Sequence, residues 1–263
     1  MAGLPLPADP TSPRELVGRV ALVTGAGGSG CGRAIARRLA REGANIIALD
    51  THERRSRTVA SDIEAEFGVK AVACIADVTE RAALDAAVGA ATTIVGPVDI
   101  LVNNAAINVQ GSIFDYSPVD FDRVLAVDLS ACWYLIRQTI GGMRDRGFGS
   151  IVNISSIAGY MGGGGVEAPY AAAKAGLHDL TRGVALEGGP HNIRCNAIAL
   201  GLVRTPFVEK DIEFYEPHIA RTPLRRLADP DEVAEVVLFL VSQRSSFITG
   251  EIVNVSGGYF LGL

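Results

Sequence analysis

One stretch decides the fold: TGAGGSGCG, residues 24–32. The apolar run before it, residues 19–24, predicts a strand, and the run after it, residues 32–42, predicts a helix. Glycines between a strand and a helix let the chain turn tightly and let a phosphate approach the backbone. The amides and the positive end of the helix favour an anion at the same place. The stretch therefore predicts the pyrophosphate site of a dinucleotide, the alternative being a turn that is merely tight.

The rest of the chain continues this alternation of short apolar runs and longer helical ones. We predict strands at residues 19–24, 45–50, 71–76, 99–103, 150–155, 193–199 and 251–255. We predict helices at residues 32–42, 54–67, 81–95, 121–146, 169–187 and 230–242. Strands that are apolar on both faces and alternate with helices indicate a parallel sheet covered on each side. The predicted fold class is α/β, a single-domain, doubly wound Rossmann-type parallel sheet of about seven strands.

The chain of 263 residues is expected to form one domain. Residues 1–15, with four prolines in the first 13 positions, are expected to be a flexible arm. Residues 16–263 would then be a single dinucleotide-binding domain, with a loop-rich insertion for the substrate near residues 205–221. The four glycines at residues 162–165 predict a mobile loop beside that insertion.

Composition and charge exclude several classes of function. The formal net charge of −5 argues against a nucleic-acid partner. No apolar run is long enough to span a bilayer, and the N-terminus lacks the pattern of a signal peptide. The four cysteines form no CxxC pair and, with the four histidines, no metal-ligand spacing, so we expect no metal. Buried, reduced thiols and a cytoplasmic location are the expectation.

An acidic residue, Asp50, ends the second predicted strand. A carboxylate there can accept hydrogen bonds from the adenosine ribose hydroxyls, and it would repel the extra phosphate of NADP. We therefore expect NAD, with NADP less favoured. Arg54 and Arg55 keep NADP open, since either could neutralise that phosphate. The alternative is that Asp50 is a solvated acid at a strand end.

Polar residues also follow the third and fourth predicted strands. Asp77 could bond the adenine edge, and Asn103 could tie strand ends together beside the cofactor. Either residue could instead cap the turn that follows it.

Three side chains predict proton chemistry near the same edge of the sheet. Tyr170 and Lys174 stand four apart at the start of a predicted helix, so both lie on one face. An ammonium and a positive nicotinamide both stabilise a phenolate, which would bring the tyrosine pKa toward the working range. The Ser156 hydroxyl, after the fifth predicted strand, can hold a substrate oxygen against Tyr170.

The ordered set of these motifs resembles the short-chain dehydrogenase/reductase family, over Val17 to Tyr259. It is most similar to the branch with beta-ketoacyl carrier-protein reductases and related alcohol dehydrogenases. The matching motifs are TGAGGSGCG, Asp50, Asp77-Val78, Asn103-Asn104-Ala105, Ser156, Tyr170-Ala-Ala-Ala-Lys174, Gly201-Leu-Val-Arg-Thr205, Ile248-Thr-Gly250 and Ser256-Gly-Gly258.

The resemblance implies roles for particular residues. Ser156 would orient the carbonyl, Tyr170 would be the acid/base, and Lys174 would lower the tyrosine pKa. The backbone of Val203 and the Thr205 side chain would hold the nicotinamide carboxamide. The implied cofactor set is Gly25, Ser29, Gly30, Cys31, Asp50, Asp77, Val78, Asn104, Ala105, Tyr170, Lys174, Val203 and Thr205.

The chain departs from the family pattern in places. The glycine turn has one extra residue, so the family's glycines map best to Gly25, Gly30 and Gly32. Asp128 stands where the family usually has a catalytic asparagine, whose main-chain carbonyl holds a water leading to the lysine. Aspartate keeps that carbonyl, and its carboxylate would favour a charged Lys174. We therefore count Asp128 among the catalytic residues and expect an active enzyme.

These observations predict an NAD(H)-dependent oxidoreductase that moves hydride between a secondary alcohol and its ketone. One alternative is a 3-oxoacyl carrier-protein or CoA thioester reductase on the same scaffold. An alternative of another class is a catalytically silent nucleotide-sensing module, which would have no need of Ser156, Tyr170 and Lys174 together. The expected partner is a small alcohol or ketone. Small residues on the helix from Pro169 and the apolar C-terminus, with the resemblance, predict a homotetramer.

Overall fold

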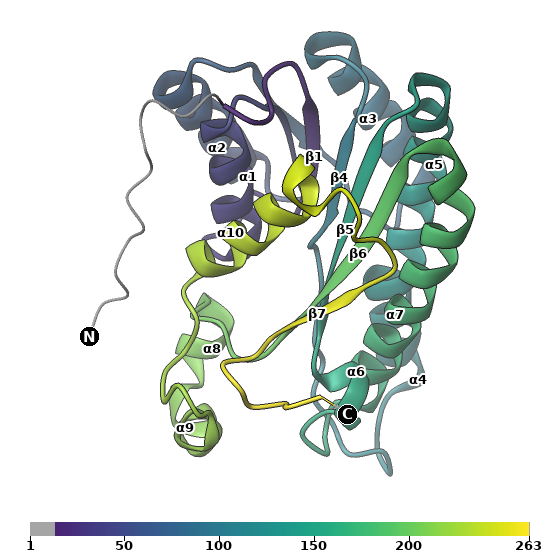
Figure 1. The fold of residues 1–263 in the computed structure, drawn as a ribbon. Coiled ribbons are helices and arrows are strands. Elements are labelled where there is room, and N and C mark those ends of the chain that lie inside the picture. Colours follow the sequence, from purple (N-terminus) through teal and green to yellow (C-terminus); the bar gives the residue numbers. More distant parts are fainter. Residues whose placement is uncertain (1–13, 263) are drawn as a thin grey trace.

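The fold is built on one seven-stranded parallel sheet with the strand order β3-β2-β1-β4-β5-β6-β7 (Figure 1). The structure is a computed structural model, and it describes residues 14–262. The strands are β1 (Val20–Thr24), β2 (Asn45–Asp50), β3 (Ala71–Ile75), β4 (Ile100–Asn103), β5 (Gly149–Ser156), β6 (Ile193–Leu200) and β7 (Ile252–Val255). All neighbouring pairs are parallel. The predicted doubly wound sheet is confirmed.

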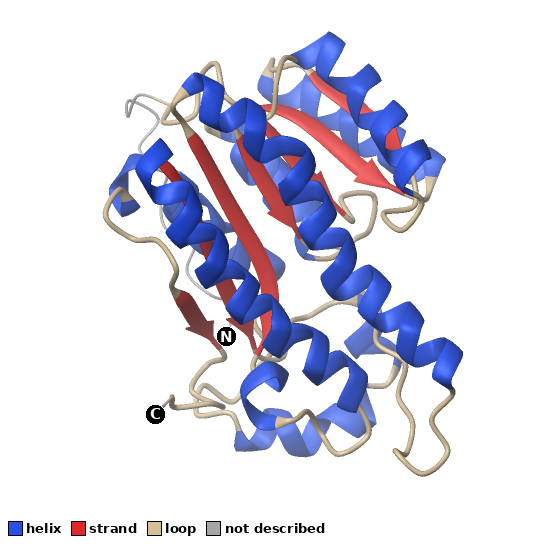
Figure 2. Cartoon of the chain, turned by 90° about the vertical axis from the view of Figure 1, so that its right-hand side faces the viewer, coloured by secondary structure: helices blue, strands red, loops and turns tan. Residues whose placement is uncertain are grey.

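Helices cover both faces of this sheet (Figure 2). One layer consists of α1 (Cys31–Arg41), α2 (Glu53–Phe67) and α10 (Pro230–Val241), and the other of α3 (Arg81–Val95), α5 (Ala131–Arg146) and α7 (Ala168–Gly188). The first strand shows why the sequence folds in this way. Ala21 and Val23 pack with the first layer and Val20 and Leu22 with the second, and none is more than 3% exposed. A strand that is apolar on both faces needs both layers.

The register gathers the carboxyl ends of the strands at one edge. Thr24 pairs with Leu49, and Asn103 pairs with Asn153 near the end of β5. The strand order reverses between β1 and β4, and the loops after these strands leave a crevice at such a point. The loops after Thr24, Asp50, Asn103 and Ser156 therefore meet at the edge where a ligand is expected.

Two expectations about helices need correction. The helix predicted over residues 121–146 consists of α4 (Pro118–Leu125), a π-helical turn (Ala126–Ser130) and α5. The insertion near residues 205–221 is not loop-rich, because α8 (Pro206–Lys210) and α9 (Ile212–Arg221) fill it. Pro217 lies inside α9. Because proline ordinarily breaks a helix interior, the sequence did not indicate a helix there.

The segment predicted to be a flexible arm, residues 1–15, lies mostly outside the described residues. In the described part of this segment, the Glu15 carboxylate forms an ion pair of 3.2 Å with the Arg244 guanidinium. The main-chain N–H of Glu15 also donates to a carboxylate oxygen of Glu42. No helix in the described part of the chain is long and apolar enough to cross a bilayer.

Candidate active site

The glycine turn after β1 is locked to the end of β4. The Thr24 hydroxyl accepts hydrogen bonds of 2.8 Å from the main-chain N–H groups of Asn104 and Ala105. The Asn104 amide donates back to the Thr24 carbonyl, also at 2.8 Å. A Cβ at Gly32 would lie 2.3 Å from the Gly25 carbonyl oxygen, so only glycine fits there. Asn104 and Ala105 thus hold the start of the glycine turn against the end of β4.

The first turn of α1 is open toward this crevice. Gly30 is the N-cap residue, no side chain caps the helix, and its first turn has no acidic residue. The first amides of a helix have no carbonyl partner within it, and they attract anions. Ser29 is exposed beside them, and Cys31 is nearly buried at the pocket wall. The residues present therefore fit a pyrophosphate group.

Asp50 lies directly beside the glycine turn. Its carboxylate accepts hydrogen bonds of 2.9 Å from the main-chain N–H groups of Gly27 and His52. A Cβ at Gly27 would lie 2.9 Å from the Asp50 carboxyl carbon, so glycine lets the acid approach the turn. Arg54 and Arg55 are exposed on α2. Asp50 is therefore fixed by the backbone, with acceptor capacity left for a ribose.

The two polar strand ends differ in what they do. Asp77 is exposed, and its carboxylate accepts from the Thr79 N–H (2.9 Å) and hydroxyl (2.7 Å), which is the turn-capping alternative. The neighbouring Val78 is buried. Asn103 donates to the Asn153 amide oxygen at 2.8 Å and so ties β4 to β5, as expected.

The four predicted catalytic residues come together at the end of β5 and the start of α7. The Ser156 hydroxyl lies beside the Tyr170 hydroxyl and lowers the pKa of that phenol. The Lys174 ammonium lies 5.3 Å from the centre of the Tyr170 ring and donates to the Ile154 carbonyl at 3.2 Å. Lys174 is 2% exposed, and its Nζ lies 3.1 Å from Oδ2 of Asp128, which is fully buried. Four residues from three elements thus form one catalytic unit, in which Lys174 and Asp128 are buried and Ser156 and Tyr170 are half-buried.

The π-helical turn directs Asp128 into this unit, and turns of this kind are frequent at functional sites. Its Oδ1 accepts a 2.9 Å hydrogen bond from the Ile107 N–H, while Oδ2 faces Lys174. Its main-chain carbonyl accepts from the Cys132 thiol at 3.5 Å. An asparagine would have one side-chain oxygen for these two donors. The carboxylate offers each a separate oxygen, with a hydrogen bond at Oδ1 and an ion pair at Oδ2.

Burial and charge set the protonation of the unit. Burial alone would lower the pKa of Lys174, but the Asp128 carboxylate and the neighbouring phenol raise it to about 12. Burial raises the pKa of Asp128, and Lys174 opposes that rise. Burial also raises the pKa of Tyr170, and the charge of Asp128 adds to the rise while Lys174 lowers it. Lys174 therefore acts on Tyr170 in the expected direction, although the pKa of Tyr170 in the protein alone remains above its ordinary value.

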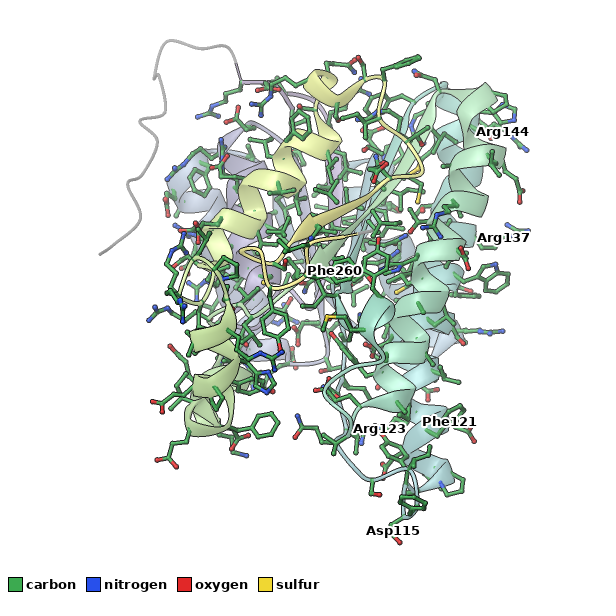
Figure 3. All side chains as sticks on the ribbon, turned by 60° about the horizontal axis from the view of Figure 1, so that its bottom comes forward. Asp115, Phe121, Arg123, Arg137, Arg144 and Phe260 are labelled. Atoms are coloured by element: carbon green, nitrogen blue, oxygen red, sulfur yellow. The ribbon has the colours of Figure 1, made fainter. Side chains whose placement is uncertain are left out.

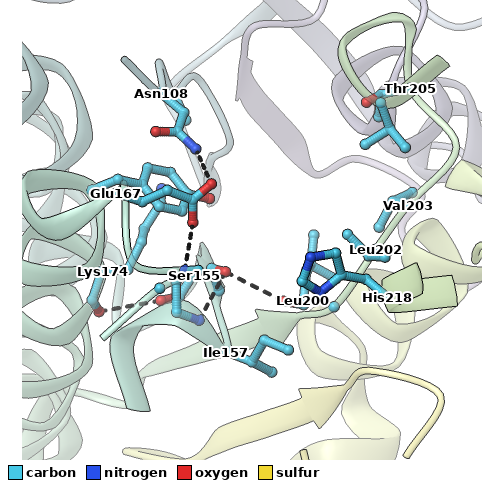
Figure 4. A pocket seen from close by; sticks show the side chains of 18 of the residues that line it. Asn108, Ser155, Ile157, Glu167, Lys174, Leu200, Leu202, Val203, Thr205 and His218 are labelled. Carbon is cyan, nitrogen blue, oxygen red and sulfur yellow. Dashed lines mark hydrogen bonds between the residues drawn. The ribbon is translucent and has the colours of Figure 1, made fainter. Parts of the chain in front are cut away.

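A pocket of about 330 Å³ opens onto Ser156, Tyr170 and Lys174 (Figure 4). Residues of the expected cofactor set at its other end are Cys31, Asn104, Val203 and Thr205. The apolar part of the wall includes Ile157, Met161, Leu202, Val208 and Phe214. Two of the predicted functions, nicotinamide binding and proton transfer, thus share one pocket. Gly25, Ser29, Gly30, Asp50, Asp77, Val78 and Ala105 do not line it.

Sequence reasoning missed polar residues of the pocket. Glu167, Asn108 and His218 line it, and the His218 Nδ1 lies 2.9 Å from the Tyr259 hydroxyl. Glu167 could have been found, because it stands three positions before Tyr170 at a helix start and therefore shares its face. His218 lies in the insertion expected to serve the substrate and Asn108 in the loop after β4, but no local pattern singles out either side chain. In the described residues, no group of acidic, cysteine or histidine side chains could hold a metal.

Known proteins resemble this chain over nearly its whole length. Residues 25–260 match the family model described as enoyl-(acyl carrier protein) reductase. The 3-oxoacyl-[acyl-carrier-protein] reductase of Aquifex aeolicus is 37% identical, over 94% of this chain and 99% of its own. The trans-4-hydroxycyclohexanecarboxylate dehydrogenase of Sinomonas cyclohexanicum is 38% identical, over 91% of this chain and 92% of its own. Among solved structures, a gluconate 5-dehydrogenase from Burkholderia cenocepacia, in complex with NADP and tartrate, has a TM-score of 0.88 and 33% identity, and the match covers 95% of this chain and 98% of that one.

Proposed function

This chain belongs to the short-chain dehydrogenase/reductase family, and from that premise we propose that it uses NAD and Tyr170 to interconvert a secondary alcohol and its ketone. It is an oxidoreductase that acts on CH–OH groups, as its relatives are. The observation that supports the finer proposal is the catalytic unit: Ser156, Tyr170 and Lys174 line the pocket, and Asp128 pairs with Lys174 behind them.

The side chains divide the work as follows. The Ser156 hydroxyl, which lies beside Tyr170, holds the substrate oxygen. The Tyr170 oxygen takes the hydroxyl proton of an alcohol, or returns it to the ketone oxygen. Lys174 lies behind the ring and stabilises the phenolate. The bound nicotinamide would accept or supply the hydride at the substrate carbon.

In the protein alone, burial and the charge of Asp128 oppose formation of the Tyr170 phenolate. Burial and Asp128 both raise the pKa of Tyr170, so Lys174 and the positive nicotinamide must together bring it down. Because alcohol oxidation uses the phenolate, we expect oxidation to be favoured at alkaline pH. Ketone reduction uses the protonated phenol and should tolerate neutral pH.

The choice of NAD over NADP rests on Asp50. Its carboxylate is fixed by two main-chain donors at the end of β2, where a 2′-phosphate would meet its charge. NADP remains the competing cofactor, since the Burkholderia relative was solved with it and Arg54 and Arg55 are exposed nearby.

The test is a comparison of kcat/KM for NAD and NADP in the wild type and in Asp50→Ser, with one secondary alcohol. We expect the wild type to prefer NAD at least about tenfold, which is the scale of one interaction between charged groups. Serine should remove that preference while protein stability stays high. A wild type that prefers NADP would overturn the assignment of Asp50.

A 3-oxoacyl thioester reductase is the second candidate, because a carrier-protein reductase is 37% identical over nearly the whole chain. The acidic residues of the insertion, Glu209, Asp211, Glu213 and Glu216, argue weakly against an anionic carrier protein at the pocket mouth. Activity only on acyl thioesters would favour this candidate.

We also propose a homotetramer in the cytoplasm. Large apolar side chains stand exposed on α4 and α5, with Val119 74%, Phe121 41% and Trp133 47% accessible. Figure 3 shows Phe121 at the outer edge of the molecule. Such a surface fits a subunit interface. The four cysteines are buried and free, as a reducing compartment allows. Light scattering at micromolar concentration tests the tetramer, and a monomeric mass would contradict it.

A further inference from the structure

The substrate side of the pocket has an unusual charge balance. Among the described side chains that line it, Glu167 is the acidic one, and Lys174 is the only lysine or arginine. Lys174 already faces the Asp128 carboxylate at 3.1 Å. His218 is joined to Tyr259 through Nδ1. An incoming carboxylate or phosphate would therefore meet Glu167, and no described lysine or arginine that lines the pocket is left to pair with it.

Glu167 is held in place as a hydrogen-bond acceptor. Its Oε1 accepts from the side-chain amides of Asn108 (2.8 Å) and Gln110 (3.3 Å), and its Oε2 accepts from the Gly164 N–H (3.4 Å). All three neighbours are donors. A carboxylate offers about four acceptor positions, so Oε2 keeps one for a further donor.

The position of Glu167 relative to the chemistry is also fixed. It is the N-cap residue of α7, one helical turn before Tyr170, and its charge acts on both Tyr170 and Tyr215. Figure 4 shows Glu167 and His218 on opposite sides of the pocket. A substrate carbinol bonded to Ser156 and Tyr170 would extend past this carboxylate.

Much of the remaining wall is apolar, and the space is about 330 Å³. Ile157, Met161 and Phe214 surround the substrate side. Part of the 330 Å³ lies toward Cys31 and Thr205, where the nicotinamide end would be, so a compact substrate fits the remainder better than a long acyl arm.

We propose that Glu167 is a specificity residue, and that the substrate is a compact, largely apolar alcohol or ketone with a second group that donates a hydrogen bond to this carboxylate. That group is a hydroxyl or an ammonium. Anionic substrates are disfavoured by the same charge. The proposal rests on the proposed alcohol–ketone chemistry and names its substrate class.

The experiment compares four probes that share one ring: cyclohexanol, trans-cyclohexane-1,4-diol, trans-4-aminocyclohexanol and trans-4-hydroxycyclohexanecarboxylate. We would measure kcat/KM with saturating NAD for the wild type, Glu167→Gln and the matched control Glu213→Gln. Glu213 is exposed on α9 and does not line the pocket. Each value is divided by that for cyclohexanol, which cancels any effect of Glu167 on Tyr170.

In the wild type we expect the diol or the amino alcohol to exceed the carboxylate by about tenfold or more, since a hydrogen bond to a charged group has this scale. Glu167→Gln should reduce that ratio about tenfold, mainly through KM, while Glu213→Gln leaves it unchanged. A larger loss for the amino alcohol than for the diol identifies an ammonium as the preferred donor, and the reverse identifies a hydroxyl.

A wild type that prefers the carboxylate, or a ratio that Glu167→Gln does not change, would overturn the proposal. If no probe is oxidised, the proposed reaction itself fails. The substrate class is then tested separately, by the dissociation constants of the diol, amino alcohol and carboxylate from the enzyme–NADH complex, read from NADH fluorescence. Equal binding of all three would overturn it there.

Discussion

Replacing Asp128 by asparagine removes one buried negative charge and almost no volume. The charge lies 3.1 Å from the Lys174 ammonium. At an effective dielectric constant of about 20, two unit charges at that distance attract by about 5 kcal/mol. Burial offsets much of this energy, because the net effect is to raise the pKa of Lys174 from 10.5 to about 12, which corresponds to about 2 kcal/mol. The phenol of Tyr170 experiences the same carboxylate with the opposite sign.

The sign of the pH effect follows from the base in the reaction. Alcohol oxidation needs deprotonated Tyr170, so its rate rises with pH through the pKa of that phenol. Burial raises this pKa, and Asp128 raises it further. Without the carboxylate the phenolate is easier to form, provided that Lys174 stays charged. The rising limb therefore moves to lower pH in Asp128→Asn.

The assay is kcat and kcat/KM for oxidation of one secondary alcohol, measured as a function of pH for the wild type and Asp128→Asn. Asp122→Asn serves as the control, because Asp122 is exposed on α4. A rising limb that stays in place would refute an electrostatic role for Asp128. A limb that moves to higher pH would show that Lys174 loses its proton in the variant, and it would refute the assigned division of charge.

Two further predictions concern the cofactor turn and the stability of the fold. Gly32→Ala should lower NADH affinity at least about tenfold, because a Cβ there would lie 2.3 Å from the Gly25 carbonyl and displace the turn; fluorescence titration measures this, and an unchanged dissociation constant would contradict the assigned phosphate site. His178 is buried, which lowers its pKa to about 4, so it stays neutral in the fold while the unfolded chain takes up a proton near pH 6.5. The free energy of unfolding should therefore fall by up to about 3 kcal/mol as pH drops from about 6.5 to about 4. Urea unfolding across this range should show a shallower fall in His178→Gln, and an identical slope in both proteins would refute the effect.

Most of the sheet could be predicted from sequence because its strands carry their own signal. Leu22 and Val23 in β1 point to opposite faces and are both buried, so the strand is a continuous apolar run. Such a run is typical of a parallel strand that helices cover on both faces. The glycine turn was also predictable, since its steric need for glycine at residue 32 is local. Both features leave a signal within a short segment of the chain.

The π-helical turn and α9 were not predictable for opposite reasons. The apolar pattern continues through residues 126–130, so a single inserted residue leaves no mark in the periodicity. In α9 the sequence signal is misleading, because Pro217 predicts the end of a helix at a point where the helix continues.

The catalytic unit was predictable in its membership and not in its contacts. Tyr170 and Lys174 share one helix, so their common face follows from spacing. The ion pair of Lys174 with Asp128 joins different elements, and its geometry depends on how the π-helical turn packs against α7. The donors around Glu167 likewise come from separate loops, which only the tertiary structure brings together.

The most direct test of the proposed chemistry is Tyr170→Phe, measured for turnover and for NADH binding in the same preparation. Phenylalanine keeps the ring beside Lys174 and removes only the hydroxyl, which lies beside Ser156. Tyr160→Phe is the control, because Tyr160 stacks on Phe260 and does not line the pocket. We predict that turnover falls by about a thousandfold in Tyr170→Phe, the scale of lost general acid–base catalysis, while NADH binds as before. Turnover at the wild-type rate in Tyr170→Phe would contradict the account.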